Sequence, residues 1–179
     1  MTKYFGLVAI IGTVIMYGQQ STPDSHSAHE KHMKEGKMAD HQQGVDHRGD
    51  HAMGFSHEKT THHFLLQSHG GLIAVEANDS QDTASRDDIR KHLTHIAQMF
   101  SAGNFSAPMF IHDQVPPGVP TMKRLKDRIT YKYESLAHGG QVRIVTKDVG
   151  ALAAVHDFLR FQITDHQTGD PLMLEKKSQ

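Results

Sequence analysis

Cysteine and tryptophan are absent from the 179 residues, and neither charge sign is in clear excess. Without thiols the chain has no disulfide, no thiolate metal ligand and no cysteine nucleophile. The 19 Lys and Arg residues against 20 Asp and Glu residues give a formal net charge of −1, so no basic surface is expected to hold nucleic acid. The motifs G-x-S-x-G, H-E-x-x-H, G-x-G-x-x-G and the Walker loop are also missing, so no common enzyme class is indicated.

Histidine and methionine stand out instead, with 16 and nine copies. An imidazole with a pKa near the model value of about 6.5 is mostly neutral at pH 7 and able to bind a metal. Metal chemistry in this protein would therefore use imidazole, thioether and carboxylate ligands.

The first 18 residues have the pattern of a secretory signal peptide. Lys3 precedes an apolar run from Tyr4 to Tyr17, which has the length of a signal-peptide hydrophobic region and is short for a membrane-spanning helix. Gly18 is small enough for cleavage, but Met16 departs from the usual A-x-A pattern, so an uncleaved anchor is the alternative. We therefore expect a periplasmic or secreted protein that touches the membrane only if residues 1–18 are retained.

Residues 19–60 are nearly devoid of branched aliphatic and aromatic side chains. Such a segment buries too little apolar surface to offset its ordering entropy, so we expect it to be disordered without metal. Its candidate metal ligands are imidazoles and thioethers, several of them next to a carboxylate that would raise the basicity of the imidazole. They are His26, His29, His32, Met33, His41, His47, His51, Met53 and His57.

This donor set predicts a soft or borderline transition metal. Imidazole suits zinc, nickel and Cu(II), whereas added thioethers favour Cu(I) or silver. Copper is the predicted ion, with zinc, nickel and silver as alternatives. A solubilising linker or a pH-sensitive spacer is the competing interpretation of residues 19–60.

Residues 61–173 predict one α+β domain, and residues 174–179 a short C-terminal tail. Strand patterns flank two His-Gly-Gly turns, at His69 and His138, whose glycines we expect to supply positive φ. Each strand pair is followed by a helical pattern, which suggests duplicated ββα units. Two such units would form a four-stranded antiparallel sheet with both helices on one face.

The first helical pattern starts at Ser85, which would form a capping box with Asp88. The second covers residues 150–163 with Asp148 as its cap. Between the two units, residues 104–121 carry four prolines and predict a long connecting loop.

Within the folded domain, His92, His95 and Met99 project within a narrow arc of the first predicted helix and would supply three metal ligands. The competing interpretation makes them the polar border of an amphipathic helix, with Met99 in the core. His62 and His63 alternate along a strand, so at most one of them faces a given site. His156 shares a face with apolar residues and is expected to be a hydrogen-bonded core histidine.

The stretch from His62 to Pro171 contains HGGLIAVEAND, IRKHLTHIAQMFSAGNFSAPMFIHD, ITYKYE and AVHDFLRFQITDHQTGD. It resembles a family of small exported bacterial proteins of unestablished activity, some of which carry the label aspartate carbamoyltransferase. That label implies two larger domains and a phosphate loop rich in Ser, Thr and Arg, and this chain has neither. The composition of residues 19–60 is loosely similar to the His/Met-rich arms of periplasmic copper-resistance proteins.

These observations predict an exported metal-binding protein that buffers copper or delivers it to a metal efflux or metallochaperone partner. The alternative is a small exported enzyme or small-molecule-binding domain that uses His112, Asp165, His166 or Arg160 and carries an accessory metal-binding tail. A partner-docking module is the third class.

Overall fold

The computed structural model describes residues 25–174, and of residues 25–30, 32 and 33 it describes only the helical backbone. The predicted signal peptide lies outside the described residues, as does most of the predicted C-terminal tail. Among the helices of residues 25–174, none combines the length and the apolar character needed to cross a membrane.

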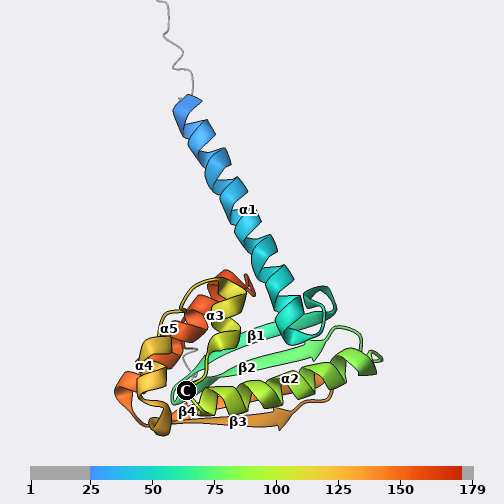
Figure 1. The fold of residues 1–179 in the computed structure, drawn as a ribbon, viewed down its shortest axis with the longest axis vertical. Coiled ribbons are helices and arrows are strands. Elements are labelled where there is room, and N and C mark those ends of the chain that lie inside the picture. The colour runs from blue at the N-terminus through green and yellow to red at the C-terminus, as the bar shows by residue number, and fades with distance from the viewer. Residues whose placement is uncertain (1–24, 175–179) are drawn as a thin grey trace, which may run out of the picture. The chain divides into compact units, whose positions relative to one another are not determined.

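Four strands form one antiparallel sheet in the order β1-β2-β4-β3 (Figure 1). Two hairpins, each from strands adjacent in sequence, meet along β2 and β4. The strands are β1 (Thr60–Gln67), β2 (Gly70–Ala77), β3 (Ile129–Ser135) and β4 (Gly139–Thr146). The predicted four-stranded antiparallel sheet is confirmed.

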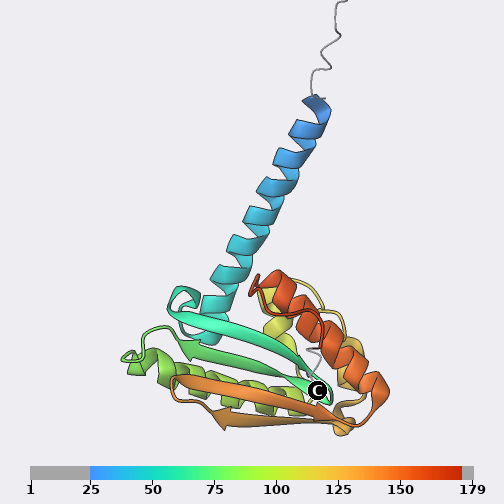
Figure 2. The same ribbon diagram turned by 180° about the vertical axis from the view of Figure 1, so that it is seen from behind.

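One face of the sheet carries the hydrophobic core. Strand alternation directs Phe64, Ile73 and Ile144 to this face, and helices α2 (Thr83–Ser101) and α5 (Val149–Asp165) pack their apolar residues into the same cluster. Figure 2 shows the sheet in front of α2. The predicted arrangement, an α+β fold with both helices on one face, is therefore confirmed.

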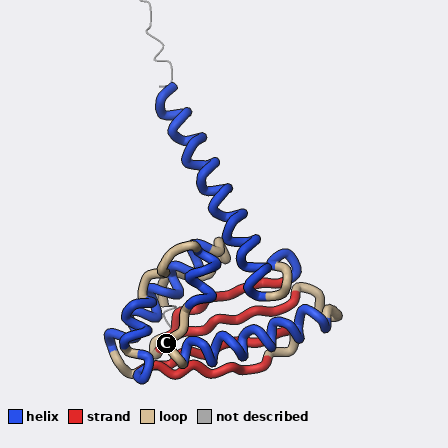
Figure 3. Tube along the Cα trace, in the orientation of Figure 1, coloured by secondary structure: helices blue, strands red, loops and turns tan. Residues whose placement is uncertain are grey.

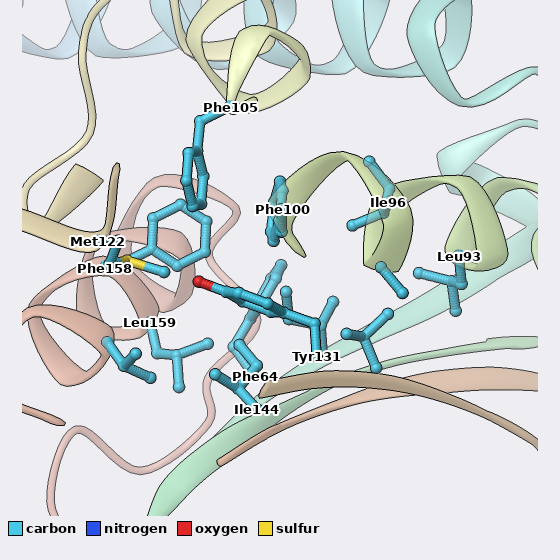
Figure 4. Packing of buried hydrophobic residues seen from close by; sticks show 14 of the residues in the cluster. Phe64, Leu93, Ile96, Phe100, Phe105, Met122, Tyr131, Ile144, Phe158 and Leu159 are labelled. Carbon is cyan, nitrogen blue, oxygen red and sulfur yellow. The ribbon is translucent and has the colours of Figure 1, made fainter. Parts of the chain in front are cut away.

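Aromatic rings fill the centre of this core (Figure 4). Phe100 of α2 stacks on Phe105 at a centroid distance of 4.5 Å and meets the rings of Tyr131 and Phe158 edge-on at 5.7 and 5.9 Å. Offset and edge-to-face pairs of this kind add to the stability gained from area burial alone. The cluster ties both helices to β3.

The two His-Gly-Gly turns depend on glycine for different reasons. Gly70 has φ = 145°, and a Cβ there would lie 1.9 Å from the carbonyl oxygen of Ile144. Gly139 has no positive φ, but its Cβ would lie 2.0 Å from the carbonyl oxygen of Val75. The expected positive φ thus holds for the first turn only, whereas close approach of β2 and β4 requires both glycines.

Residues 25–59 differ from the predicted disorder. They contain α1 (Ser25–Met53) and the short 3-10 helix η1 (His57–Lys59). No proline interrupts α1, and its Ala, Glu, Lys, Gln and Met residues are good helix formers. Helix propensity therefore favours order in this segment even though its apolar content is low. Val45 and Phe55 are buried, and the compact unit begins at Gly36, well before residue 61. Residues 19–24 lie outside the described residues.

The predicted loop over residues 104–121 is also wrong for much of its length. Helices α3 (Ser106–His112) and α4 (Val119–Arg124) occupy it, followed by the 3-10 helix η2 (Lys126–Arg128) (Figure 3). Pro108 and Pro120 lie in the first turns of α3 and α4, where a missing N–H costs no helical hydrogen bond. The prolines therefore start helices here instead of preventing them.

The cap of α2 is Asp82, not the predicted Ser85. The Asp82 carboxylate accepts hydrogen bonds from the backbone N–H of Ser85 (3.0 Å) and from its hydroxyl (2.8 Å). We expect Asp82→Ala to lower the urea midpoint of unfolding, because it leaves a first-turn N–H without its partner. Asp88→Ala, at the position of the predicted capping box, should leave the midpoint unchanged, and equal midpoints for both variants would contradict this assignment.

Candidate functional site

Seven histidines gather where the C-terminal part of α1, η1, β1, α2, α3 and the end of α5 come together. Shared carboxylates, stacked rings and close charges link them. We call them the histidine cluster: His41, His57, His62, His63, His92, His112 and His166.

Asp165, the last residue of α5, joins two members of the cluster. One of its oxygens accepts a hydrogen bond from His112 Nδ1 at 2.5 Å, and the other accepts one from His41 Nε2 at 3.0 Å. Burial raises the pKa of Asp165, but these two imidazoles outweigh it and hold the pKa below its usual value. Asp165 therefore connects α1 to the body of the domain as an ionised carboxylate.

His112 is completely buried, and both its ring nitrogens have partners. Its Nε2 lies 3.1 Å from the side-chain oxygen of Gln162, whose Nε2 is itself buried without a partner among the described residues. With its amide turned over, Gln162 would donate to His112 Nε2, and His112 would be the neutral tautomer that donates to Asp165. His112 thus holds Asp165 in place and has no nitrogen left for a ligand.

Two further members pair with carboxylates of their own. His57 Nδ1 lies 2.9 Å from the carboxylate of Asp50. Partial burial lowers the pKa of His57, but the negative charges of Asp50 and Asp46 outweigh burial, so the pKa is raised. His63 Nδ1 donates to Asp170 at 2.8 Å. The same carboxylate accepts the backbone N–H of Phe64 at 2.9 Å, which covers part of the free edge of β1.

The remaining three members, His62, His92 and His166, are half-buried and have no hydrogen-bonded carboxylate among the described residues. Burial first, and then the charge of neighbouring histidines, lowers the pKa of His62 and of His92 to about 4 and that of His166 to about 3. All three are therefore neutral at pH 7. Within the described part of the chain, the fully buried Nε2 of His62 has no hydrogen-bond partner.

Two neighbouring cavities open between these imidazoles. A cavity of about 60 Å³ is lined by Met53, His62, His92 and His166 together with core residues. A second of about 210 Å³ shares Met53, His62 and His166 and extends towards His57. Typical ligand pockets measure roughly 300–1,000 Å³, so these cavities fit an ion with a few waters better than an organic molecule.

The structure places the predicted ligands of residues 19–60 in different surroundings. His26, His29, His32 and Met33 lie on α1, but their side chains are outside the description. His47 and His51 are exposed on α1, and His41 and His57 are paired with carboxylates. Met53 lines both cavities.

The three predicted ligands on α2 do not share one environment. His92 lines the smaller cavity and meets Phe55 edge-on at 5.7 Å, whereas His95 is exposed and Met99 packs against the hydrophobic core. Over residues 25–174, no group of three or more His, Asp or Glu side chains is arranged to hold a metal ion. A metal bound by this domain would need thioether ligands or a pair of imidazoles.

His62 and His166 are members of the cluster that the predicted metal ligands do not include. The strand pattern carried a usable signal for His62, because Phe64 is a core residue and His62 lies two positions before it on the same face.

His112, Asp165 and His166 belong to the predicted alternative enzyme site, and the structure does bring them together. Arg160 lies apart, bonded to the carbonyl of Leu172 at 3.0 Å. The predicted core histidine, His156, is buried and bonded to the carbonyls of Gln67 and Gly70.

No protein-family model matches this chain, and no curated protein or solved structure matches it either. The resemblances drawn from the sequence stay predictions.

Proposed function

We propose that this protein binds transition-metal ions outside the cytoplasm, copper above all, and buffers them or passes them on. The observation that carries the proposal is the density of imidazole and thioether donors from His26 to His57, in a chain without a single thiol. Export rests on the signal-peptide pattern of residues 1–18. A metal efflux pump or a metallochaperone is the corresponding partner.

The helical form of α1 supports ion capture in one specific way. His47 and His51 are exposed and four residues apart, so their side chains project from the same side of the helix. Asp46 directly precedes His47 in the sequence, and Asp50 directly precedes His51. Both carboxylates contact the ring of His57 instead of the rings of His47 and His51. Two neighbouring imidazoles that no carboxylate of the described residues engages form a chelating pair for copper, zinc or nickel.

Copper uptake by the full-length protein tests the proposal. We expect the variant in which His26, His29, His32, His47 and His51 are all replaced by glutamine to lose most of its copper capacity in equilibrium dialysis at pH 7.5. The matched control is the double variant His69→Gln, His138→Gln, which removes two exposed imidazoles from the hairpin turns. Equal copper capacities for the two variants would overturn the role of α1, and parallel runs with zinc, nickel and silver identify the preferred metal.

The alternative function, a small exported enzyme, is favoured by one observation. His166 lines the cavity of about 210 Å³, and its ring lies 4.9 Å from that of His112, which is paired with Asp165. Both nitrogens of His112 and both oxygens of Asp165 are already bonded, which leaves His166 as the free acid or base. Hydrolysis of small ester substrates that is lost in His166→Gln and kept in the five-histidine variant would support this alternative.

A further inference from the structure

We propose that Met53, His62 and His166 form a separate three-coordinate site for Cu(I) inside the histidine cluster. This inference rests on the proposed function and deepens it, because it names a buried site distinct from the exposed histidines of α1. The three donors come from three elements: the last residue of α1, strand β1 and the residue that caps the C-terminus of α5.

The shared cavities bring the three side chains together. Met53, His62 and His166 line both the cavity of about 60 Å³ and the cavity of about 210 Å³. The rings of His62 and His166 are almost parallel, with an interplanar angle of 2° and centroids 6.0 Å apart. The buried Nε2 of His62, which has no partner among the described residues, supplies a lone pair that nothing else uses.

The nearby carboxylates already have partners, which disfavours hard oxygen ligation at the site. Asp46, which lines the larger cavity, accepts a hydrogen bond from Gln42 at 2.9 Å and lies 3.8 Å from His57. Both oxygens of Asp165 accept hydrogen bonds from histidines, and Asp170 accepts from His63, Thr168 and the backbone of Phe64. The donors that both cavities share are two imidazoles and one thioether, because His92 lines only the smaller cavity. Among the described residues no three His, Asp or Glu side chains are arranged around one ion, so His92 does not complete a set of four ligands. Structural zinc sites take four ligands, whereas a soft sulfur donor selects Cu(I) or Ag(I).

Aromatic side chains enclose the two imidazoles. Phe64 stacks on His166 at 5.5 Å, and Phe55 stacks on His62 at 6.2 Å. Their hydrophobic surroundings limit water access and lower the local polarity, which disfavours the additional charge of Cu(II). Together with the donor set, this predicts that the site holds copper in its reduced state.

Anaerobic competition with a Cu(I)-specific chelator tests the site in the full-length protein. We expect Met53→Leu to weaken the tightest Cu(I) binding at least about 100-fold, since even outer-shell changes cost metal sites 10–100-fold. Leucine conserves the volume of methionine, so Met53→Leu keeps the fold. His62→Gln and His166→Gln should each give a similar loss. The matched controls are Met99→Leu and His95→Gln, which remove the donors predicted on α2 and should leave the affinity unchanged.

X-ray absorption of the one-equivalent Cu(I) complex gives a second readout that does not depend on stability. We expect a sulfur neighbour of copper in the wild type and none in Met53→Leu. Tight Cu(I) binding that survives in the five-histidine variant of α1 and disappears in His62→Gln supports the buried site. Wild-type affinity in Met53→Leu, His62→Gln and His166→Gln overturns the buried site and leaves the proposed function standing. No copper uptake by the wild-type protein overturns both.

Discussion

Acidifying the metal-free protein from pH 7 to pH 4.5 should unfold it. The cause is the half-buried trio His62, His92 and His166, whose pKa values in the folded protein are about 4, about 4 and about 3. In the unfolded chain an imidazole titrates near 6.5. Between the folded and the unfolded pKa values, the imidazoles bind protons in the unfolded state but not in the folded state. The free energy of unfolding therefore falls as the pH falls.

The size of this effect is comparable to the stability of a whole domain. Each pH unit below 6.5 removes about 1.4 kcal/mol per group, so at pH 5 each imidazole costs about 2 kcal/mol and the trio about 6 kcal/mol. Typical domains unfold at a cost of about 5–15 kcal/mol. His57 acts in the opposite direction, because its raised pKa contributes stability that is fully present below pH 6.5, but it offsets only part of the loss. Below about pH 4 the lowered pKa of Asp165 adds a further loss.

Urea unfolding at pH 7, 6 and 5 in the presence of a chelator measures this slope. His166→Phe removes one titrating ring from a site already lined by aromatic rings, and it should make the fall in stability with pH distinctly shallower. The control His138→Phe removes an exposed imidazole from a hairpin turn and should leave the slope as in the wild type. A wild-type free energy of unfolding that is the same at pH 7 and pH 5 would refute the half-buried, neutral state of the trio.

Local patterns predicted the sheet and its two long helices, because each of these elements carries its own periodicity. Ile89, Leu93 and Phe100 recur at helical spacing, and all three are buried in the structure. Apolar content alone does not predict α1, which is helical although it has few branched aliphatic and aromatic residues. A chain rich in helix formers needs few apolar contacts to extend a helix from a packed C-terminal end, here anchored by Val45.

The candidate site was less accessible to sequence reasoning, because its members are far apart in the chain. Met53, His62 and His166 belong to three elements, and no spacing rule relates them. Spacing favoured His92, His95 and Met99 instead, since all three lie on one flank of a helix, but only His92 turns towards the cavity. A periodic pattern indicates which residues share a face of one element, whereas a binding site is formed between elements.

Replacing Asp165 by alanine should destabilise the protein by about 3 kcal/mol, because it leaves the Nδ1–H of fully buried His112 without an acceptor. It also releases His41, so backbone amides of α1 near His41 should exchange hydrogen faster in native conditions. Asp157→Ala is the matched control on the same helix. It removes an exposed carboxylate that, among the described residues, meets only Arg160, and it should change stability by less than about 0.5 kcal/mol.

Asp165→Asn separates the two consequences of losing the carboxylate. In this variant the His112 ring would carry its proton on Nε2 and donate it to the side-chain oxygen of Gln162. Nδ1 of His112 would then accept a hydrogen bond from the asparagine amide. We therefore expect this variant to lose about half as much stability as Asp165→Ala, since the buried ring stays satisfied and only the charge is lost. The free energies of unfolding from urea curves at pH 7 provide the comparison. Equal losses in Asp165→Asn and Asp165→Ala would mean that the negative charge, and not a partner for the buried ring, is what Asp165 supplies.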